Sequence, residues 1–364
     1  MPKHFIPAIE KDIQESLEAI DKITNQTSQP SFDNTIDALQ NIGEFLERNS
    51  ALLFNLNSAE TSEEIQKITQ QASPILTKFQ NDVRLNQALF ERIKIVYENR
   101  ENENLTTEQL ALLEKEFKGF TRNGALLSKD KKDILREIDT KKAQLSLRFG
   151  ENVLADTNSF SLHVTEEKEL KGIPDQVREM AADIARSKNK TGWVFTLDYP
   201  SYVPFMTYLE DRSLRRKMSL AFGKRGFQEN DHNNSEIILK LIELRKKRAE
   251  LLGYESHASF VLEERMAGSE ENVNNFLEDL YQKALPAAKK EWKEVEDFAK
   301  EKLNLDKIEK WDTAYVSEKL KQAQLDLNEQ LLKPYFPLEK VKLGLFEIVG
   351  KLYGLSFKKN TDIE

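Results

Sequence analysis

The sequence predicts a mainly α-helical protein with a small β ribbon near its middle. Apolar residues recur every three or four positions along most of the chain, which is the spacing of helices with one buried face. No proline lies between Pro74 and Pro174, so a long stretch of chain is free of helix breakers. Two short segments, 160–164 and 193–197, instead have the apolar alternation or the β-branched and aromatic content of strands.

The N-terminal third is expected to form several helices. Apolar residues between Phe32 and Leu56 are spaced by three and four positions, which predicts one buried face on a long helix. Thr61 with Glu64 has the spacing of a capping box and indicates a further helix start. Thr106 with Gln109 indicates another. Short turns are expected at 99–104 and 122–129.

The pattern of apolar residues changes from helical to strand-like near residue 156. Phe160, Leu162 and Val164 alternate as in a strand, and a second β-rich run, 193–197, is expected to pair with it as a ribbon. The helical pattern then resumes. Its longest piece, 270–303, would span about 50 Å, and we expect Pro286 to bend it.

Composition excludes several classes of function. The chain has 364 residues, enough for two compact units. Its net charge of −8 argues against a nucleic-acid partner. No run approaches the roughly 18 apolar residues of a membrane helix, so no membrane partner is expected. The absence of cysteine excludes disulfides, thiolate catalysis and Cys-ligated zinc.

The N-terminal segment, "MPKHFIPAIEKDIQ", lacks the apolar run of a signal peptide. The cytoplasm is therefore the expected location. The alternative left open is that a leader peptide was removed.

The stretch "LGYESHASFVLEERMA" (252–267) raises the question of a zinc site, because His257 precedes Glu263 and Glu264. A His-Glu zinc helix needs a second histidine four residues on, where Val261 stands. Glu264 lies almost two turns away, about 11 Å along the axis, which is too far for one ion. The other histidines, His4, His163 and His232, are distant in sequence.

We therefore interpret this stretch as a helix start. Ser256 or Ser259 is the expected cap, with His257 half exposed and with Phe260 and Val261 in the core.

The sequence contains no motif for phosphate binding, dinucleotide binding or a catalytic serine either. The "GKRGF" run at 223–227 lacks the spacing of a phosphate loop or dinucleotide fingerprint, and no serine occupies a nucleophile-elbow pattern. The motifs alone assign no catalytic residue and no metal ligand.

Several stretches in order nevertheless resemble the M3 family of zinc oligopeptidases, which includes oligopeptidase A, peptidyl-dipeptidase Dcp and thimet oligopeptidase. The resemblance runs from about Ile6 to Phe357. The matching stretches are "PAIEKDIQESLEAID", "PSFDNTIDAL", "FTLDYPSYVPFMTY" with "DRSLRRKM", "LRKKRAELLGYESHASFVLEERMA", "WDTAYVSEK" and "LLKPYFPLEKVKLGLFEIVGKLYGLSF".

The resemblance implies a neurolysin- or Dcp-like helical fold in which many helices wall a narrow channel for short peptides. In the family, zinc sits on an HExxH helix whose glutamate activates the zinc-bound water. This sequence contains no HExxH. The chain therefore resembles the N-terminal part of such a peptidase, truncated before the zinc motif. It is expected to be inactive alone and to bind no zinc, and its implied partners are short peptides and the missing C-terminal half.

The resemblance also implies a division into three segments. Residues 1–156 would be the N-terminal helical domain, 157–208 a mixed α/β connection, and 209–364 the start of the catalytic domain. Trp311 and Tyr315 are the candidates for the channel wall. The family usually carries a second aromatic residue where this chain has Val316, and packing is the competing interpretation for both candidates.

Two functions remain open at this point. One is a truncated metallopeptidase, whose choice between endo-acting and dipeptide-releasing cleavage the sequence leaves undecided. The other is a non-catalytic helical module that binds peptides or proteins. Because catalytic-domain helices would lack packing partners, we also expect self-association of the chain.

Overall fold

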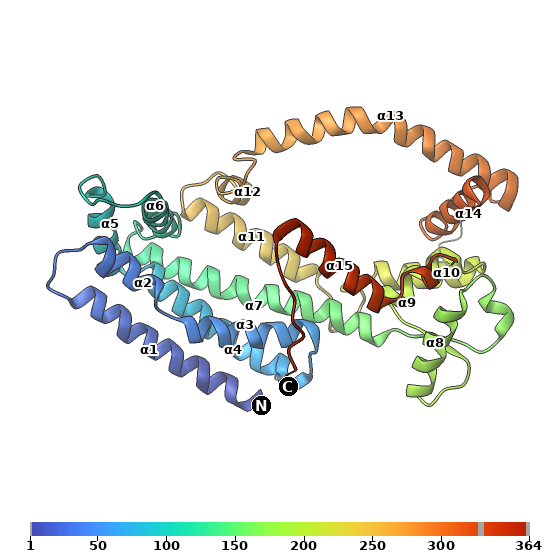
Figure 1. Cartoon of the computed structure of the whole chain (residues 1–364), viewed down its shortest axis with the longest axis horizontal. Coiled ribbons are helices and arrows are strands. Elements are labelled where there is room, and N and C mark those ends of the chain that lie inside the picture. The colour runs from blue at the N-terminus through green and yellow to red at the C-terminus, as the bar shows by residue number, and fades with distance from the viewer. Residues whose placement is uncertain (1, 327–330, 362–364) are drawn as a thin grey trace. The chain divides into compact units, whose positions relative to one another are not determined.

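The computed structural model describes residues 2–326 and 331–361, and it confirms a mainly α-helical fold with one two-stranded sheet (Figure 1). The chain forms two compact units, each made of two stretches. Unit 1 contains residues 1–155 and 226–280, and unit 2 contains 156–225 and 281–364. The three segments expected from the family resemblance stay a prediction. Within the described residues, no helix is long and apolar enough to cross a membrane.

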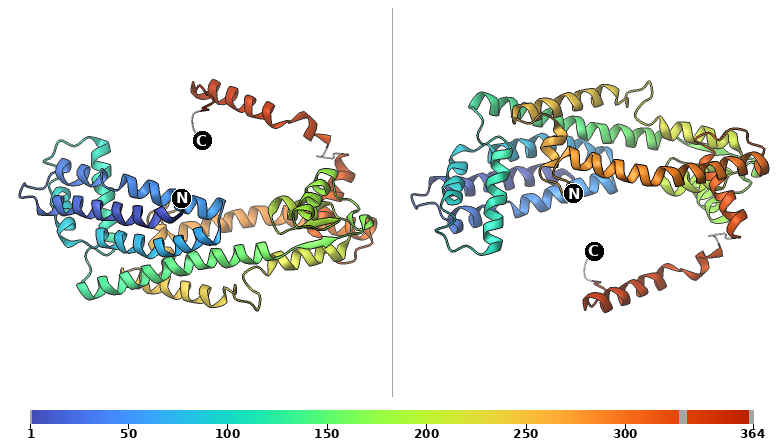
Figure 2. Two further views of the ribbon diagram at one scale, coloured as in Figure 1. Left: turned by 90° about the horizontal axis from the view of Figure 1, so that it is seen from below. Right: turned by 90° about the horizontal axis from the view of Figure 1, so that it is seen from above.

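The described residues of unit 1 form helices and the turns between them. In chain order they are η1 (Pro2–His4), α1 (Phe5–Asn25), the π-helical turn η2 (Phe32–Asp37), α2 (Ala38–Gln40), α3 (Glu44–Ala59), α4 (Glu63–Arg84), α5 (Gln87–Glu98), α6 (Thr107–Arg122), most of α7 (Lys129–Ser159), α11 (Ser235–Leu251), α12 (His257–Leu262) and the start of α13 (Glu270–Leu303). Helices α1, α3 and α4 pack side by side, as do α5 and α6 (Figure 2). The turns expected at 99–104 and 122–129 are confirmed.

The single long helix expected from Phe32 to Leu56 is wrong. The chain forms η2 and α2, breaks at Gly43, and begins again as α3. Gly43 has φ +89°, a left-handed conformation that a residue with a side chain adopts only at a cost. The break turns Phe45 away from the core, where it is 61% exposed, although Leu46 and Leu53 remain buried.

Helix starts in unit 1 follow local capping. The Thr106–Gln109 capping box is present, with both side chains bonded to backbone N–H groups. The start expected at Thr61 is displaced by one residue, because Ser62 is the cap and accepts a hydrogen bond from the Ile65 N–H. These bonds satisfy amide groups that the first helical turn leaves without partners.

Unit 2 joins the ribbon to a second group of helices. Its elements are the end of α7, β1 (Leu162–Val164), η3 (Glu167–Leu170), α8 (Asp175–Ser187), β2 (Trp193–Phe195), α9 (Tyr199–Tyr208), α10 (Arg212–Gly223), the remainder of α13, α14 (Thr313–Leu325), η5 (Lys333–Tyr335) and α15 (Leu338–Tyr353). The expected pairing is confirmed: β1 and β2 are antiparallel, with Leu162 opposite Phe195. Helix α13 has the predicted bounds and continues through Pro286.

The core of unit 2 lies between the ribbon, α8, α9 and α10. Phe195 and Phe205 are fully buried there, with ring centroids 4.7 Å apart in an edge-to-face arrangement. Gly192 lets the ribbon close, because it has φ +79° and a Cβ at that position would lie 2.4 Å from the Val164 carbonyl oxygen. A separate cluster around Ala299, Tyr315 and Val316 joins α13 to α14.

Candidate functional site

A buried ion pair positions the segment that carries the predicted channel-wall residues. Arg215 on α10 is 1% exposed and Asp312, just before α14, is fully buried. The Arg215 Nη2 lies 2.9 Å from Asp312 Oδ1. The Arg215 guanidinium also donates to the backbone carbonyls of Leu209, Glu210 and Trp311.

A second arginine completes the environment of Asp312. Arg212 donates from Nε to both carboxylate oxygens at 3.0 Å and from Nη2 to Oδ2 at 2.7 Å. The Glu309 N–H adds a bond of 3.1 Å to Oδ2. Burial opposes ionisation of Asp312, but the bonds from Arg212, the Glu309 N–H and Arg215 outweigh it and hold the pKa of Asp312 below its ordinary value.

Trp311 and Tyr315 lie on either side of Asp312 in the sequence, and their side chains pack in two different clusters. Tyr315 is 9% exposed and packs in the α13–α14 cluster, with the Arg215 guanidinium 4.1 Å from its ring centre. Trp311 is half-buried against the core of unit 2, and Arg216 lies 5.5 Å from its ring. Val316 is fully buried in the same cluster as Tyr315.

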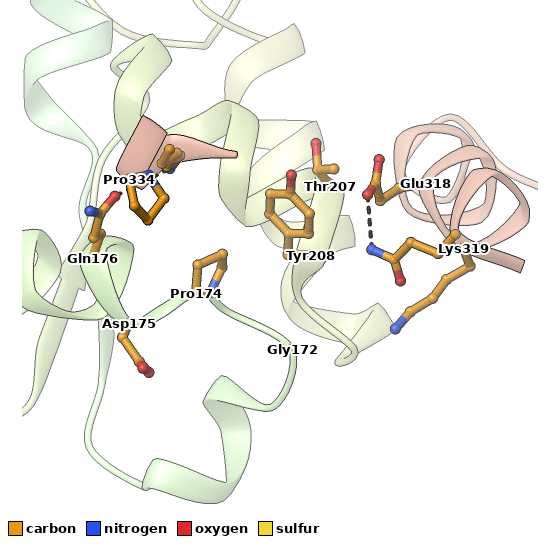
Figure 3. Close-up of a pocket in the computed structure, with 11 residues that line it drawn as sticks. Gly172, Pro174, Asp175, Gln176, Thr207, Tyr208, Glu318, Lys319 and Pro334 are labelled. Atoms are coloured by element: carbon orange, nitrogen blue, oxygen red, sulfur yellow. Dashed lines mark hydrogen bonds between the residues drawn. The ribbon is translucent and has the colours of Figure 1, made fainter. Parts of the chain in front are cut away.

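A cavity of about 600 Å³ lies beside α14 in unit 2 (Figure 3). Glu318, Lys319 and Gln322 line it from α14, and Figure 3 shows Tyr208 of α9 between these residues and Pro174. The remaining lining residues are Gly172, Asp175, Gln176, Thr207, Lys333 and Pro334.

The cavity wall is continuous with the predicted site. Lys319 follows Tyr315 by one helical turn, and its Nζ lies 5.5 Å from the Tyr315 ring centre. Glu318 accepts a hydrogen bond of 2.8 Å from the Gln322 amide. Sequence reasoning missed these residues, although their positions three, four and seven residues after Tyr315 put them near the same helix face.

The stretch around His257 is a helix start, as expected. Ser256 caps α12 by accepting a hydrogen bond of 2.9 Å from the Ser259 N–H, and His257 is half-buried. Phe260 and Val261 are half-buried too, so the expectation that they lie in the core is met only in part. Burial, followed by the charges of Arg245, Lys142 and Arg248, lowers the pKa of His257.

The two glutamates after His257 form ion pairs with a neighbouring helix. Glu263 pairs with Arg122 and accepts a hydrogen bond of 2.6 Å from the Tyr254 hydroxyl, and Glu264 pairs with Lys118. Across residues 2–326 and 331–361, no group of three or more His, Cys, Asp or Glu side chains is arranged to hold a metal ion.

Replacing Asp312 by Asn should destabilise the protein strongly. The amide keeps the shape but leaves Arg215 buried without its counter-charge, which costs about 3–5 kcal/mol in the free energy of unfolding. Urea unfolding measures this loss. The exposed pair between Lys293 and Asp297 offers the control, and Asp297→Asn should cost at most about 0.5 kcal/mol.

The loss should also depend on pH. Because the native pKa of Asp312 is lowered, its contribution to stability is present above the ordinary aspartate value of 3.8 and disappears as the pH falls through the native pKa. The difference between wild type and Asp312→Asn should therefore shrink in acid. Equal costs for the two Asn variants at pH 7 would contradict the role assigned to the ion pair.

Comparison with known proteins finds matches along most of the chain. Residues 205–364 match the family model "Peptidase family M3", and residues 6–132 match "Neurolysin/Thimet oligopeptidase, N-terminal domain". Oligopeptidase A of Escherichia coli is 31% identical over 100% of this chain and 54% of its own length. Dipeptidyl carboxypeptidase of the same organism is 31% identical over 99% and 53%, respectively. The probable cytosolic oligopeptidase A of Arabidopsis thaliana is 29% identical over 96% and 50%. The chain belongs to peptidase family M3, and it spans about half the length of the curated relatives it matches.

Proposed function

We propose that this chain forms part of a zinc-dependent M3 peptidase that hydrolyses short peptides in a narrow channel. The observation that carries the proposal is the joint match of residues 6–132 and 205–364 to two models of this family. A relative named oligopeptidase A and one named dipeptidyl carboxypeptidase are equally similar, at 31% identity. Similarity therefore leaves the mode of cleavage open. The cytoplasm remains our proposed location.

The residues of this chain do not fit the zinc site that the family uses. None of its four histidines precedes a glutamate, so the HExxH pair of ligands is missing from residues 1–364. The one histidine near two glutamates, His257, is surrounded by arginine and lysine charges that oppose binding of a cation. We therefore propose that this polypeptide by itself neither holds zinc nor cleaves peptides.

The purified chain should show no peptidase activity with added zinc. A quenched fluorogenic peptide reports turnover, and elemental analysis after dialysis reports bound zinc, expected well below one ion per chain. Oligopeptidase A of Escherichia coli serves as the positive control for the substrate. Turnover that persists through purification and disappears with a chelator would contradict the inactivity of this chain.

Within unit 2, the cavity beside α14 is the surface we propose for peptide contact. Its lining offers a cation from Lys319, an amide from Gln322 and the Tyr208 ring, which together suit the carbonyls and side chains of a peptide. We keep Trp311 and Tyr315 as candidates for the channel wall. Because Tyr315 is buried, its proposed role is to position α14 and Lys319, and not to stack on substrate.

The second candidate function is a non-catalytic peptide-binding module. The absence of fitting zinc ligands from this sequence favours it, because the cavity of unit 2 does not depend on a metal. The two functions share the same cavity and differ only in whether peptide is cleaved.

Calorimetry with a panel of short peptides should detect binding at this cavity. Lys319→Glu should weaken the affinity about tenfold or more. The change removes a charge-assisted hydrogen-bond donor, and the new carboxylate would repel the carbonyl oxygens and carboxylates of a peptide. Lys300→Glu on exposed α13 makes the same change of charge away from the cavity and should leave the affinity unchanged. No heat across the panel would count against the module, and equal weakening by both variants would contradict the cavity as the site.

Helix α15 carries a large apolar surface. Leu338, Val341, Leu345, Ile348 and Leu352 are spaced by three and four residues, and they are between 47% and 77% exposed. Such a stripe on a single helix is the surface of a packing contact. We propose that the rest of the M3 fold covers it in the complete peptidase, and that a second copy covers it when this chain is alone.

Light scattering should show dimers or larger species for the purified chain. The double variant Leu345→Glu with Ile348→Glu should shift it toward monomer by placing charges in the apolar stripe. Lys340→Glu, outside that stripe, should leave the association unchanged. A monomer at high concentration in the wild-type protein would contradict the prediction.

A further inference from the structure

A second cavity, in unit 1, combines an excess of positive charge with a buried donor that lacks a partner. Its volume is about 450 Å³. Its lining comes from four elements: α4, the residue after α6, α7 and α11. Among the lining residues, Arg84, Lys142 and Arg248 are cations and Asp139 is the one carboxylate.

The single carboxylate is shared between two of these cations. Asp139 Oδ1 lies 2.8 Å from the Arg248 Nε and 3.1 Å from the Lys142 Nζ. Arg248 also donates from Nη2 to the Asn123 side-chain oxygen at 2.9 Å. Arg84 has its own partner, Glu116, at 2.8 Å. Asp139 alone therefore cannot neutralise the side of the cavity formed by α7 and α11.

Neighbouring cations also act on Lys142 and on His257. Burial first, and then the charge of Arg248 and of Arg245, lower the pKa of Lys142, although Asp139 opposes the shift. Burial first, and then the charges of Arg245, Lys142 and Arg248, lower the pKa of His257 as well. An anion in the cavity would relieve both effects.

Asn81 on α4 supplies the second, independent observation. It lines the cavity, it is only 8% exposed, and its side-chain Nδ2 has no hydrogen-bond partner among the residues that the structure describes. A buried amide donor without a partner is unfavourable unless a ligand accepts its hydrogen bond. An unsatisfied donor therefore lies in the α4 wall of this cavity, and Lys142 and Arg248 line it from α7 and α11.

We propose that this cavity of unit 1 binds a small dianionic oxyanion, such as a phosphate group, between α4, α7 and α11. The Asn81 amide, after a small rotation of its side chain, and the free N–H donors of the Lys142 ammonium would bond its oxygens, with Arg248 supplying further charge. Because the ligand contacts helices far apart in sequence, its binding stabilises unit 1 in the folded state. The site is separate from the cavity beside α14, which lies in unit 2.

Calorimetry on the full chain with inorganic phosphate, at constant ionic strength and pH 7, tests the proposal. We expect a single site whose affinity falls about tenfold or more in Lys142→Met, which loses a charge-assisted donor. Lys141→Met is the matched control, because Lys141 is the next residue on α7, is exposed, and does not line the cavity. It should bind phosphate as the wild type does.

Asn81→Asp provides a second variant that preserves shape. The new carboxylate would occupy the place of the ligand's charge, so phosphate binding should be lost while thermal stability without phosphate is kept. Sulfate should bind like phosphate, and acetate should bind much more weakly. No heat with phosphate, equal weakening by Lys141→Met and Lys142→Met, or acetate binding as tight as phosphate would each overturn the proposal.

Discussion

The buried contact between Arg215 and Asp312 is the constraint on which unit 2 depends. Taking both charges out of water is costly, and the pair is tolerated because nearly every donor of Arg215 meets an acceptor and Arg212 adds a second counter-charge. The two residues are 97 positions apart in sequence. Their contact therefore holds the segment before α14 against the start of α10, and packing against α9 and α13 places the rest of α14.

The direction of α14 decides what the candidate site offers to a ligand. Tyr315 turns into the cluster with α13, whereas Lys319 and Gln322 line the cavity. Tyr315, which the family resemblance offered as a channel-wall candidate with packing as the competing interpretation, thus packs beneath the polar residues one and two turns later. This division of roles is compatible with membership of peptidase family M3 whether the chain acts within a peptidase or as a binding module.

Unit 1 is held together by a different balance of forces. Its helices bury apolar clusters, and arginines bridge the helix ends: Arg122 contacts Glu263 and the Phe260 carbonyl, and Arg248 contacts Asp139 and Asn123. The chain as a whole is acidic, with a net charge of −8, yet cations outnumber carboxylates around the cavity between α4, α7 and α11. Net charge describes the average field, and a local site depends on which side chains the packing brings together.

The sequence by itself determined the helical class, the β ribbon, the helix start at Thr106, a helix start at Ser256 or Ser259, and the family. These features depend on spacing, on capping bonds between neighbours, or on ordered motifs, all of which are local in the chain. Only the tertiary structure decided that Gly43 interrupts an apolar stripe, that Arg215 meets Asp312, and which charged residues line each cavity. Those outcomes rest on contacts between residues far apart in sequence, and no periodicity of one segment encodes the position of its partner.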